Sequence, residues 1–154
     1  MEPIRKILVT TDFSPTATVA LDPARELAKR FDAEVTLLHV IDDGVLPLYV
    51  EYVPVALDDI RRKHEEQSRK KLEVLAKEAF GDGTRVQWRL AEGVPYQAIV
   101  ETAEEIGADM IVMATHGRGF LSHAILGSTT ERVLRRAVCP VLVVRDTRDG
   151  SARK

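Results

Sequence analysis

Residues Asp109–Ala114 read DMIVMA, an apolar run in which hydrophobic side chains do not alternate with polar ones. A strand of that composition needs cover on both faces, as in a parallel sheet flanked by helices. Similar short runs recur along the chain at regular intervals. The other strand candidates are Ile4–Thr10, Glu34–Val40, Arg85–Leu90 and Val141–Val144. We therefore expect five strands.

Longer amphipathic stretches separate these runs. We expect helices at about residues 15–31, 56–80, 94–107 and 120–138. Strands that alternate with helices indicate an α/β fold, here a five-stranded parallel sheet with helices on both faces. Arg85–Leu90 (RVQWRL) does alternate, so one of its faces is wet and it suits an edge. With right-handed crossovers, this predicts the Rossmann-like strand order 3-2-1-4-5.

Local signals set the expected helix limits. Ser14 can cap the first helix, whereas Pro23 predicts a kink or an early break in it. Apolar stripes that include Phe31 in the first helix and Ile60 in the second are expected to face the core. The last helix should stop at Cys139-Pro140.

The predicted order leaves the fifth strand at the second edge of the sheet. Its side chains are apolar and uncharged, and such an edge invites pairing with another chain. We therefore expect a homodimer joined through Val141, Leu142, Val143 and Val144. The alternative is that the tail, residues 145–154, folds back over this edge, which its polar composition disfavours.

The composition suits one globular domain. The chain has 154 residues, 45% of them hydrophobic and 30% charged. We expect a single domain over residues 1–146 and a flexible C-terminal tail over 147–154. A net charge of −2 gives no basic field for nucleic acid or a membrane surface. The single cysteine, Cys139, permits no internal disulfide and favours a cytoplasmic location.

The candidate site lies where the strand order reverses. Ligands of open parallel sheets bind beyond the carboxyl ends of the strands at that point. Here it falls between the first strand, which ends in Thr11-Asp12, and the fourth, which ends in Ala114-Thr115-His116-Gly117.

A second signal follows after nine residues. Gly127 precedes Ser128-Thr129-Thr130-Glu131, a Ser-x-x-Glu pattern typical of a capping box, so a helix should start at Ser128. Free amides at a helix start attract anions, and a glycine lets a phosphate approach the backbone. Arg118 would supply a cation. The alternative is that Gly127 is only a turn residue and Ser128 only a cap. The chain has neither a P-loop nor the dinucleotide fingerprint.

At these residues the chain resembles the universal stress protein family over nearly its whole length. The ATP-binding branch of that family carries Gly-x2-Gly-x9-Gly-Ser/Thr, which Gly117-x9-Gly127-Ser128 matches. The segments KILVTTDFSP, MATHGRG and CPVLVVR are also similar to family segments. One departure is Ala114, which stands where the motif has its first glycine and whose methyl group we expect near the ribose.

The resemblance implies roles for residues of this chain. Asp12 would contact adenine or ribose, next to Thr11, and Val40 would border the adenine. Ribose and phosphates would lie near Met113, Ala114, His116, Gly117 and Arg118. The phosphate tail would be held by Gly127, Ser128, Thr129 and Thr130. The resemblance further implies ATP as the ligand, accompanied by Mg²⁺, and a dimer through the last strand.

No arrangement of catalytic residues stands out. His39 lies within a strand and is expected to be a satisfied core histidine, and Asp42-Asp43 lacks partners for a metal site. We expect a ligand-dependent switch, not an enzyme, with slow ATP hydrolysis as a side activity. An ATP-independent interaction module is the alternative. The loop 42–55 is expected either to act as a lid or to pack on the sheet.

Overall fold

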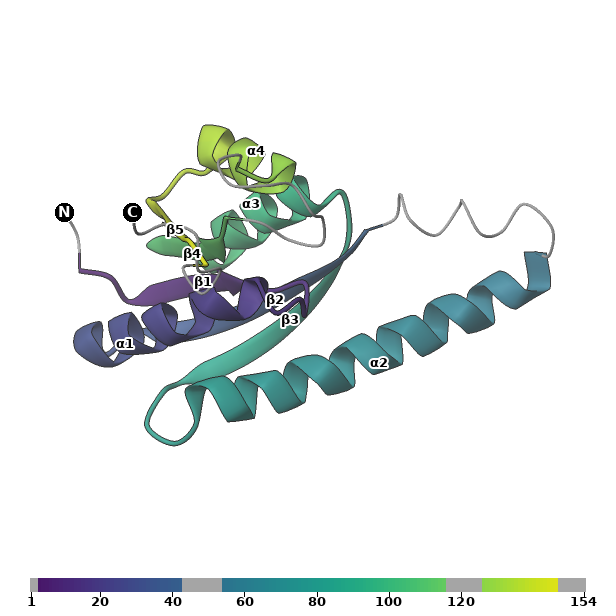
Figure 1. The fold of residues 1–154 in the computed structure, drawn as a ribbon, viewed down its shortest axis with the longest axis horizontal. Helices are drawn as coiled ribbons and strands as arrows, with labels where there is room; N and C mark the ends of the chain where they lie inside the picture. Colours follow the sequence, from purple (N-terminus) through teal and green to yellow (C-terminus); the bar gives the residue numbers. More distant parts are fainter. Residues whose placement is uncertain (1–2, 43–53, 116–125, 147–154) are drawn as a thin grey trace, which may run out of the picture.

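The computed structural model describes residues 3–42, 54–115 and 126–146. Its centre is a five-stranded parallel sheet in the order β3-β2-β1-β4-β5, as predicted (Figure 1). The strands are β1 (Lys6–Thr10), β2 (Glu34–Asp42), β3 (Val86–Gly93), β4 (Met110–Ala114) and β5 (Val141–Val144).

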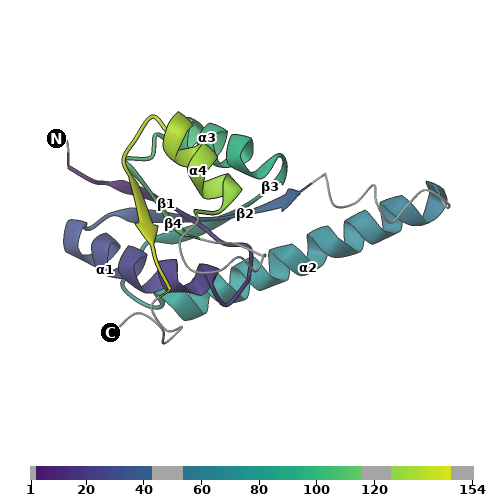
Figure 2. The same ribbon diagram turned by 45° about the horizontal axis from the view of Figure 1, so that its top comes forward.

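Helices cover both faces of this sheet. In Figure 2, α1 and α2 lie on one side of the strands and α3 and α4 on the other. The helical elements are a 3₁₀ turn η1 (Ala17–Ala20), α1 (Leu21–Phe31), α2 (Pro54–Phe80), α3 (Pro95–Ile106) and α4 (Ser128–Arg136).

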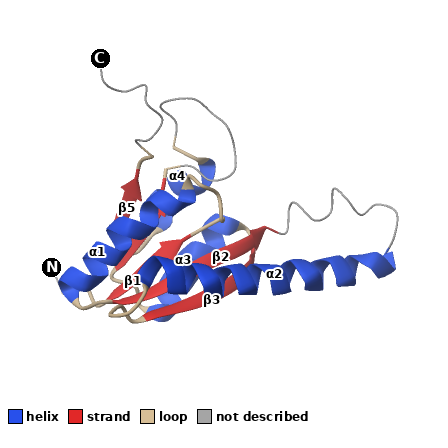
Figure 3. Ribbon diagram, turned by 60° about the horizontal axis from the view of Figure 1, so that its bottom comes forward, coloured by secondary structure: helices blue, strands red, loops and turns tan. Residues whose placement is uncertain are grey.

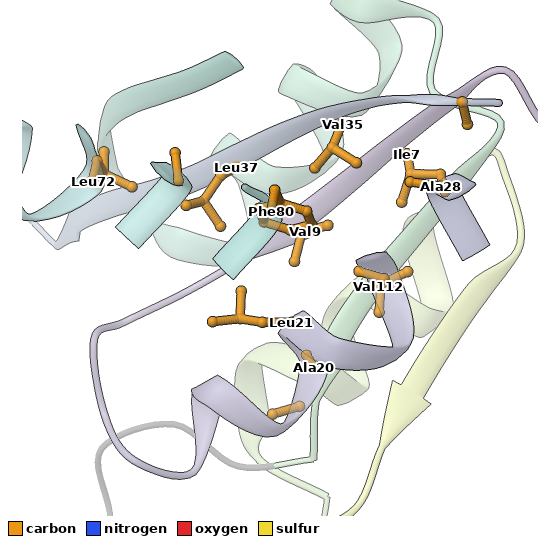
Figure 4. Close-up of a cluster of buried hydrophobic side chains, with 14 of the residues drawn as sticks. Ile7, Val9, Ala20, Leu21, Ala28, Val35, Leu37, Leu72, Phe80 and Val112 are labelled. Carbon is orange, nitrogen blue, oxygen red and sulfur yellow. The ribbon is translucent and has the colours of Figure 1, made fainter. Parts of the chain in front are cut away.

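The central strand supplies side chains to two hydrophobic clusters. Ile7, Leu8 and Val9 of β1 are fully buried. Ile7 and Val9 pack with α1 and α2, as Figure 4 shows, whereas Leu8 packs with α3 and α4. This alternation is the pattern of a strand with both faces covered. The non-alternating apolar sequence therefore predicted the position of β1 correctly.

The first predicted helix is divided in two. Residues 17–20 form η1, and the α-helix begins only at Leu21. Pro23 consequently lies in the first turn of α1, where its missing N–H would have no intrahelical acceptor. The predicted early break is confirmed. Ser14 Oγ accepts a hydrogen bond from the Ala17 amide, the first of the 3₁₀ turn, at 3.1 Å, although the N-cap position itself is occupied by Thr16.

Two apolar side chains are not buried as predicted. Ile60 of α2 is 50% exposed and Phe31, the last residue of α1, is 46% exposed. Figure 3 shows the reason for Ile60, because the N-terminal part of α2 extends beyond the sheet and has no strand beneath it. Among residues 58–80 of α2, burial is confined to the C-terminal part, where Leu72 and Phe80 enter the core.

The last helix is shorter than predicted. α4 runs from Ser128 to Arg136, and Leu126 and Gly127 before it are not helical. Residues 120–125 of the predicted helix lie outside the described part of the chain. The helix ends before Cys139-Pro140 because Ala137 has extended backbone, with ψ 137°.

No helix among the described residues is both long and apolar enough to cross a membrane.

We predict that Phe80→Ala lowers the free energy of unfolding by about 3–5 kcal/mol, because it removes a fully packed ring and leaves a cavity under α2. Urea denaturation measures the change. Val74→Ala on the same helix is the matched control, since Val74 is 52% exposed, and it should alter stability by less than about 0.5 kcal/mol. Equal effects of the two substitutions would contradict the packing described here.

Candidate functional site

The candidate site lies at the carboxyl ends of β1 and β4. These strands are neighbours, with Val9 paired to Val112, and the chain leaves β1 toward β2 but leaves β4 toward β5. Helices that follow adjacent strands to opposite sides leave a gap above the strand ends. This is the reversal point that the sequence predicted.

The start of α4 is fastened to the end of β4. The Gly127 amide donates to the Thr115 carbonyl at 2.9 Å. The buried Thr130 hydroxyl donates to the Ala114 carbonyl at 3.2 Å and lies 3.4 Å from that of Thr115. The Thr115 amide in turn donates to the Val144 carbonyl at 3.0 Å. The first turn of α4 is thus held over the strand ends.

The predicted capping box is wrong. The residue at the N-cap is Gly127, and Ser128 is already the first helical residue, so its hydroxyl makes no capping hydrogen bond. The Glu131 carboxylate pairs with Arg135 at 2.8 Å and does not reach back to the helix start. Because Ser128 is already helical, it lies one position after the N-cap, where a serine side chain does not cap the helix.

The missing cap leaves donors free. The first amide that has an intrahelical acceptor is that of Glu131, which donates to the Gly127 carbonyl at 2.9 Å. Within the described part of the chain, no acceptor contacts the amides of Ser128, Thr129 and Thr130. Three N–H groups at the positive end of a helix form a site for an anion.

The backbone of Gly127 does not require glycine. Its φ of −57° and ψ of 147° are accessible to any residue. Conformational freedom therefore does not explain the glycine. Its consequence is that residue 127 has no side-chain oxygen that could accept from the amides at the helix start.

The turn after β1 forms the neighbouring wall of the site. The Thr11 hydroxyl accepts from the Phe13 amide at 3.0 Å, and an Asp12 carboxylate oxygen accepts from the Ser14 amide at 2.9 Å. Phe13 has a φ of 63°, a left-handed conformation that is unfavourable for a bulky residue. Such strain is of the order of 1–3 kcal/mol and is maintained by surrounding contacts.

The predicted pocket residues of β2 and β4 are divided between the two faces of the sheet, with Val40 and Met113 on one face and Ala114 on the other. Val40 and Met113 pack in the cluster under α3 and α4, the side on which α4 begins. Ala114 packs in the other cluster, under η1 and α1, and is only 7% exposed. The Ala114 methyl group therefore points away from Val40 and Met113. The backbone carbonyl of Ala114, which accepts a hydrogen bond from the Thr130 hydroxyl, faces the start of α4.

Three predicted site residues, His116, Gly117 and Arg118, lie outside the described part of the chain. So do Asp43 and most of the predicted lid. The other predicted site residues lie near the carboxyl ends of β1, β2 and β4 or at the start of α4, namely Thr11, Asp12, Val40, Met113, Ala114, Gly127, Ser128, Thr129 and Thr130. Sequence reasoning missed the strained Phe13, because a positive φ at phenylalanine has no sequence signal.

Two further ionisable side chains of the described residues, His39 and Cys139, are at least half-buried. His39 is buried with a partner, as predicted, since its Nδ1 donates to the Thr11 carbonyl at 2.8 Å. Cys139 is half-buried, and burial, followed by the charge of Asp109, raises the pKa of its thiol. The described residues contain no cluster of three groups able to hold a metal ion.

A hollow of about 550 Å³ lies elsewhere, between α1, α2 and the end of β5. Its walls include Leu21, Leu75 and Val144, which belong to or pack against the cluster under α1 and α2. Val40 and Met113 pack on the opposite face of the sheet.

We predict that Thr130→Val destabilises the protein by about 1–3 kcal/mol, since it leaves the buried carbonyl of Ala114 without this donor. Thr129→Val is the matched control, because Thr129 is only half-buried and makes no side-chain hydrogen bond to another described residue. Urea midpoints of the two variants should differ. If they coincide, the fastening of α4 to β4 contributes nothing.

Comparison with known proteins gives a consistent result over nearly the whole chain. The sequence model of the universal stress protein family matches residues 3–145. The universal stress protein MJ0577 of Methanocaldococcus jannaschii is 36% identical over 154 aligned positions, which cover 92% of this chain and 94% of that protein. Universal stress protein YxiE of Bacillus subtilis is 34% identical, over 91% of this chain and 98% of that protein.

Solved structures agree. The structure of MJ0577 superposes with a TM-score of 0.83 at 36% identity and covers 95% of this chain and 99% of that one. A universal stress protein in complex with cAMP has the same fold, with a TM-score of 0.61 at 24% identity over 94% of this chain and 98% of that one. The family match and the relatives that extend along nearly the entire chain show that this protein belongs to the universal stress protein family.

Proposed function

We propose that this protein binds ATP at the carboxyl ends of β1 and β4 and acts as a dimeric, ligand-dependent switch in the stress response. One observation carries the proposal. The amides of Ser128, Thr129 and Thr130 have no acceptor among the described residues and are held over the strand ends by Gly127 and the Thr130 hydroxyl.

The phosphate tail would occupy these three amides. A helix start offers directed N–H donors together with the positive end of the helix dipole, so phosphate binding needs no lysine of the P-loop kind. Ser128 is exposed and adds a hydroxyl. The Thr130 hydroxyl already donates to a carbonyl, so Thr130 would offer its amide alone.

The rest of the nucleotide would extend across the ends of β1 and β2. Val40 and Met113 offer apolar surface on the face where α4 begins, and Asp12 offers a carboxylate at the adjoining turn. Gly117, with His116 and Arg118, would form the remaining wall. Mg²⁺ would accompany the triphosphate. That a protein of this fold was solved with cAMP is compatible with an adenine nucleotide here, although at 24% identity the likeness bears on the fold alone.

The dimer would form through β5. Its outer edge pairs with no strand among the described residues, and apolar side chains beside it are exposed, with Val138 at 69% and Leu142 at 37%. A second copy that pairs edge to edge would satisfy the free backbone groups and cover these side chains. ATP would then change the surface that the dimer presents to partner proteins.

We predict that Ser128→Pro weakens ATP binding roughly 10- to 100-fold, because it deletes one charge-assisted amide donor. Proline suits the first helical position, and Gly127 already has the extended backbone that a residue before proline needs, so the fold should persist. Ser128→Ala is the matched control. It removes only the hydroxyl and should retain most of the affinity. Isothermal titration calorimetry with MgATP measures both.

Wild-type protein that binds no ATP at millimolar concentration would refute the proposal and favour the ATP-independent interaction module. Equal affinities of Ser128→Pro and wild type would show that the amides are not the phosphate site. Turnover of labelled ATP with Mg²⁺ distinguishes a hydrolase, since a switch should release product slowly or not at all.

We predict that Val138→Asp converts the dimer into monomers at micromolar concentration, because it places a carboxylate beside the paired edge. Val74→Asp is the control, since Val74 is also exposed, at 52%, but lies on α2. Sedimentation equilibrium gives the mass of each variant. A Val138→Asp protein that remains dimeric would place the interface elsewhere.

A further inference from the structure

His39 is a buried polar side chain in β2. It is 6% exposed, and its neighbours Leu38 and Ile41 in β2 are buried as well. An apolar residue would fill the same space without the cost of burying an imidazole. Its presence calls for a role that a leucine could not perform.

The imidazole holds the turn that follows β1. Nδ1 lies 2.8 Å from the Thr11 carbonyl oxygen, which can only accept, so Nδ1 carries the proton and donates. The Thr11 amide also binds to β2, through the Leu38 carbonyl at 2.9 Å. Both backbone polar groups of Thr11 are thus fixed by two consecutive residues of β2.

Phe13 adds a contact on the other side of the imidazole. The Phe13 and His39 rings lie 4.3 Å apart between centroids, and Lys71 of α2 places its Nζ 5.5 Å from the centre of the Phe13 ring. These contacts maintain Phe13 at its positive φ of 63°. His39 therefore contacts the residues on both sides of Asp12.

The conformation of this turn decides where the Asp12 carboxylate lies. One carboxylate oxygen accepts from the Ser14 amide at 2.9 Å, so the side chain follows the backbone of the turn. In the sheet order, β1 lies between β4 and β2. A nucleotide whose phosphates occupy the start of α4, after β4, must therefore cross the end of β1 to reach β2.

We propose that His39 is a positioning residue for the nucleoside half of the site, which it serves without touching the ligand, by fixing the Thr11–Ser14 turn and with it Asp12. This inference rests on the proposed nucleotide binding. It separates two functions within the site. The α4 amides recognise phosphate, whereas the turn held by His39 recognises the nucleoside.

The experiment compares two probes, MgATP and inorganic tripolyphosphate with Mg²⁺, by calorimetry on the full chain. His39→Leu removes the donor and keeps a similar volume. We expect it to bind ATP on the order of tenfold more weakly, the loss typical of one ordered hydrogen bond, and to bind tripolyphosphate as wild type does. His39→Asn places an amide N–H near the position of Nδ1 and should restore most of the ATP affinity.

Thermal unfolding is recorded for each variant. If His39→Leu does not fold, Phe13→Ala loosens the same imidazole from the turn side and should give the same selective loss. ATP affinity unchanged in the folded variants would overturn the inference and leave the proposed function intact. An equal loss of ATP and tripolyphosphate, not restored by asparagine, would also overturn it, because it would reflect damage to the whole site. Wild-type protein that binds neither probe would refute the proposed function itself.

Discussion

Burial of β1 on both faces is the constraint on which the rest of the structure depends. Ile7, Leu8 and Val9 are inaccessible to solvent, so helices must cover the sheet from two sides. Right-handed connections then send the chain from β1 to one side and from β4 to the other. The reversal of strand order between β1 and β4 follows from this arrangement, and the carboxyl ends of the strands at such a point are where a parallel sheet can hold a ligand.

The site itself depends on polar groups that the fold leaves without partners. Packing explains why α4 lies against α3, but it does not explain why the helix starts without a side-chain cap. Gly127, by occupying the N-cap with no side chain, keeps three amides open where serine or aspartate would have closed one of them.

Periodicity predicted the strand order, the helix-covered faces and the reversal of strand order between β1 and β4, because hydrophobic patterning dominates those features. The sequence could not predict which of Gly127 and Ser128 occupies the N-cap. Both residues are good N-caps. The choice depends on the hydrogen bond between Gly127 and Thr115, which lies outside the regular hydrogen bonding of helices and strands. Ile60 was misplaced for a related reason, since an apolar stripe records the helix but not where the sheet beneath it ends.

Thr115 connects the candidate site to the outer edge of the sheet, because its carbonyl and its amide each form one backbone hydrogen bond. Its carbonyl receives the Gly127 amide, and its own amide donates to the Val144 carbonyl at the end of β5. The first turn of α4 and the last residue of the edge strand are therefore joined by backbone hydrogen bonds to one shared residue. Signal transfer between an occupied pocket and an oligomeric contact would need no domain rotation in such an arrangement, only the displacement of one residue shared by two hydrogen bonds.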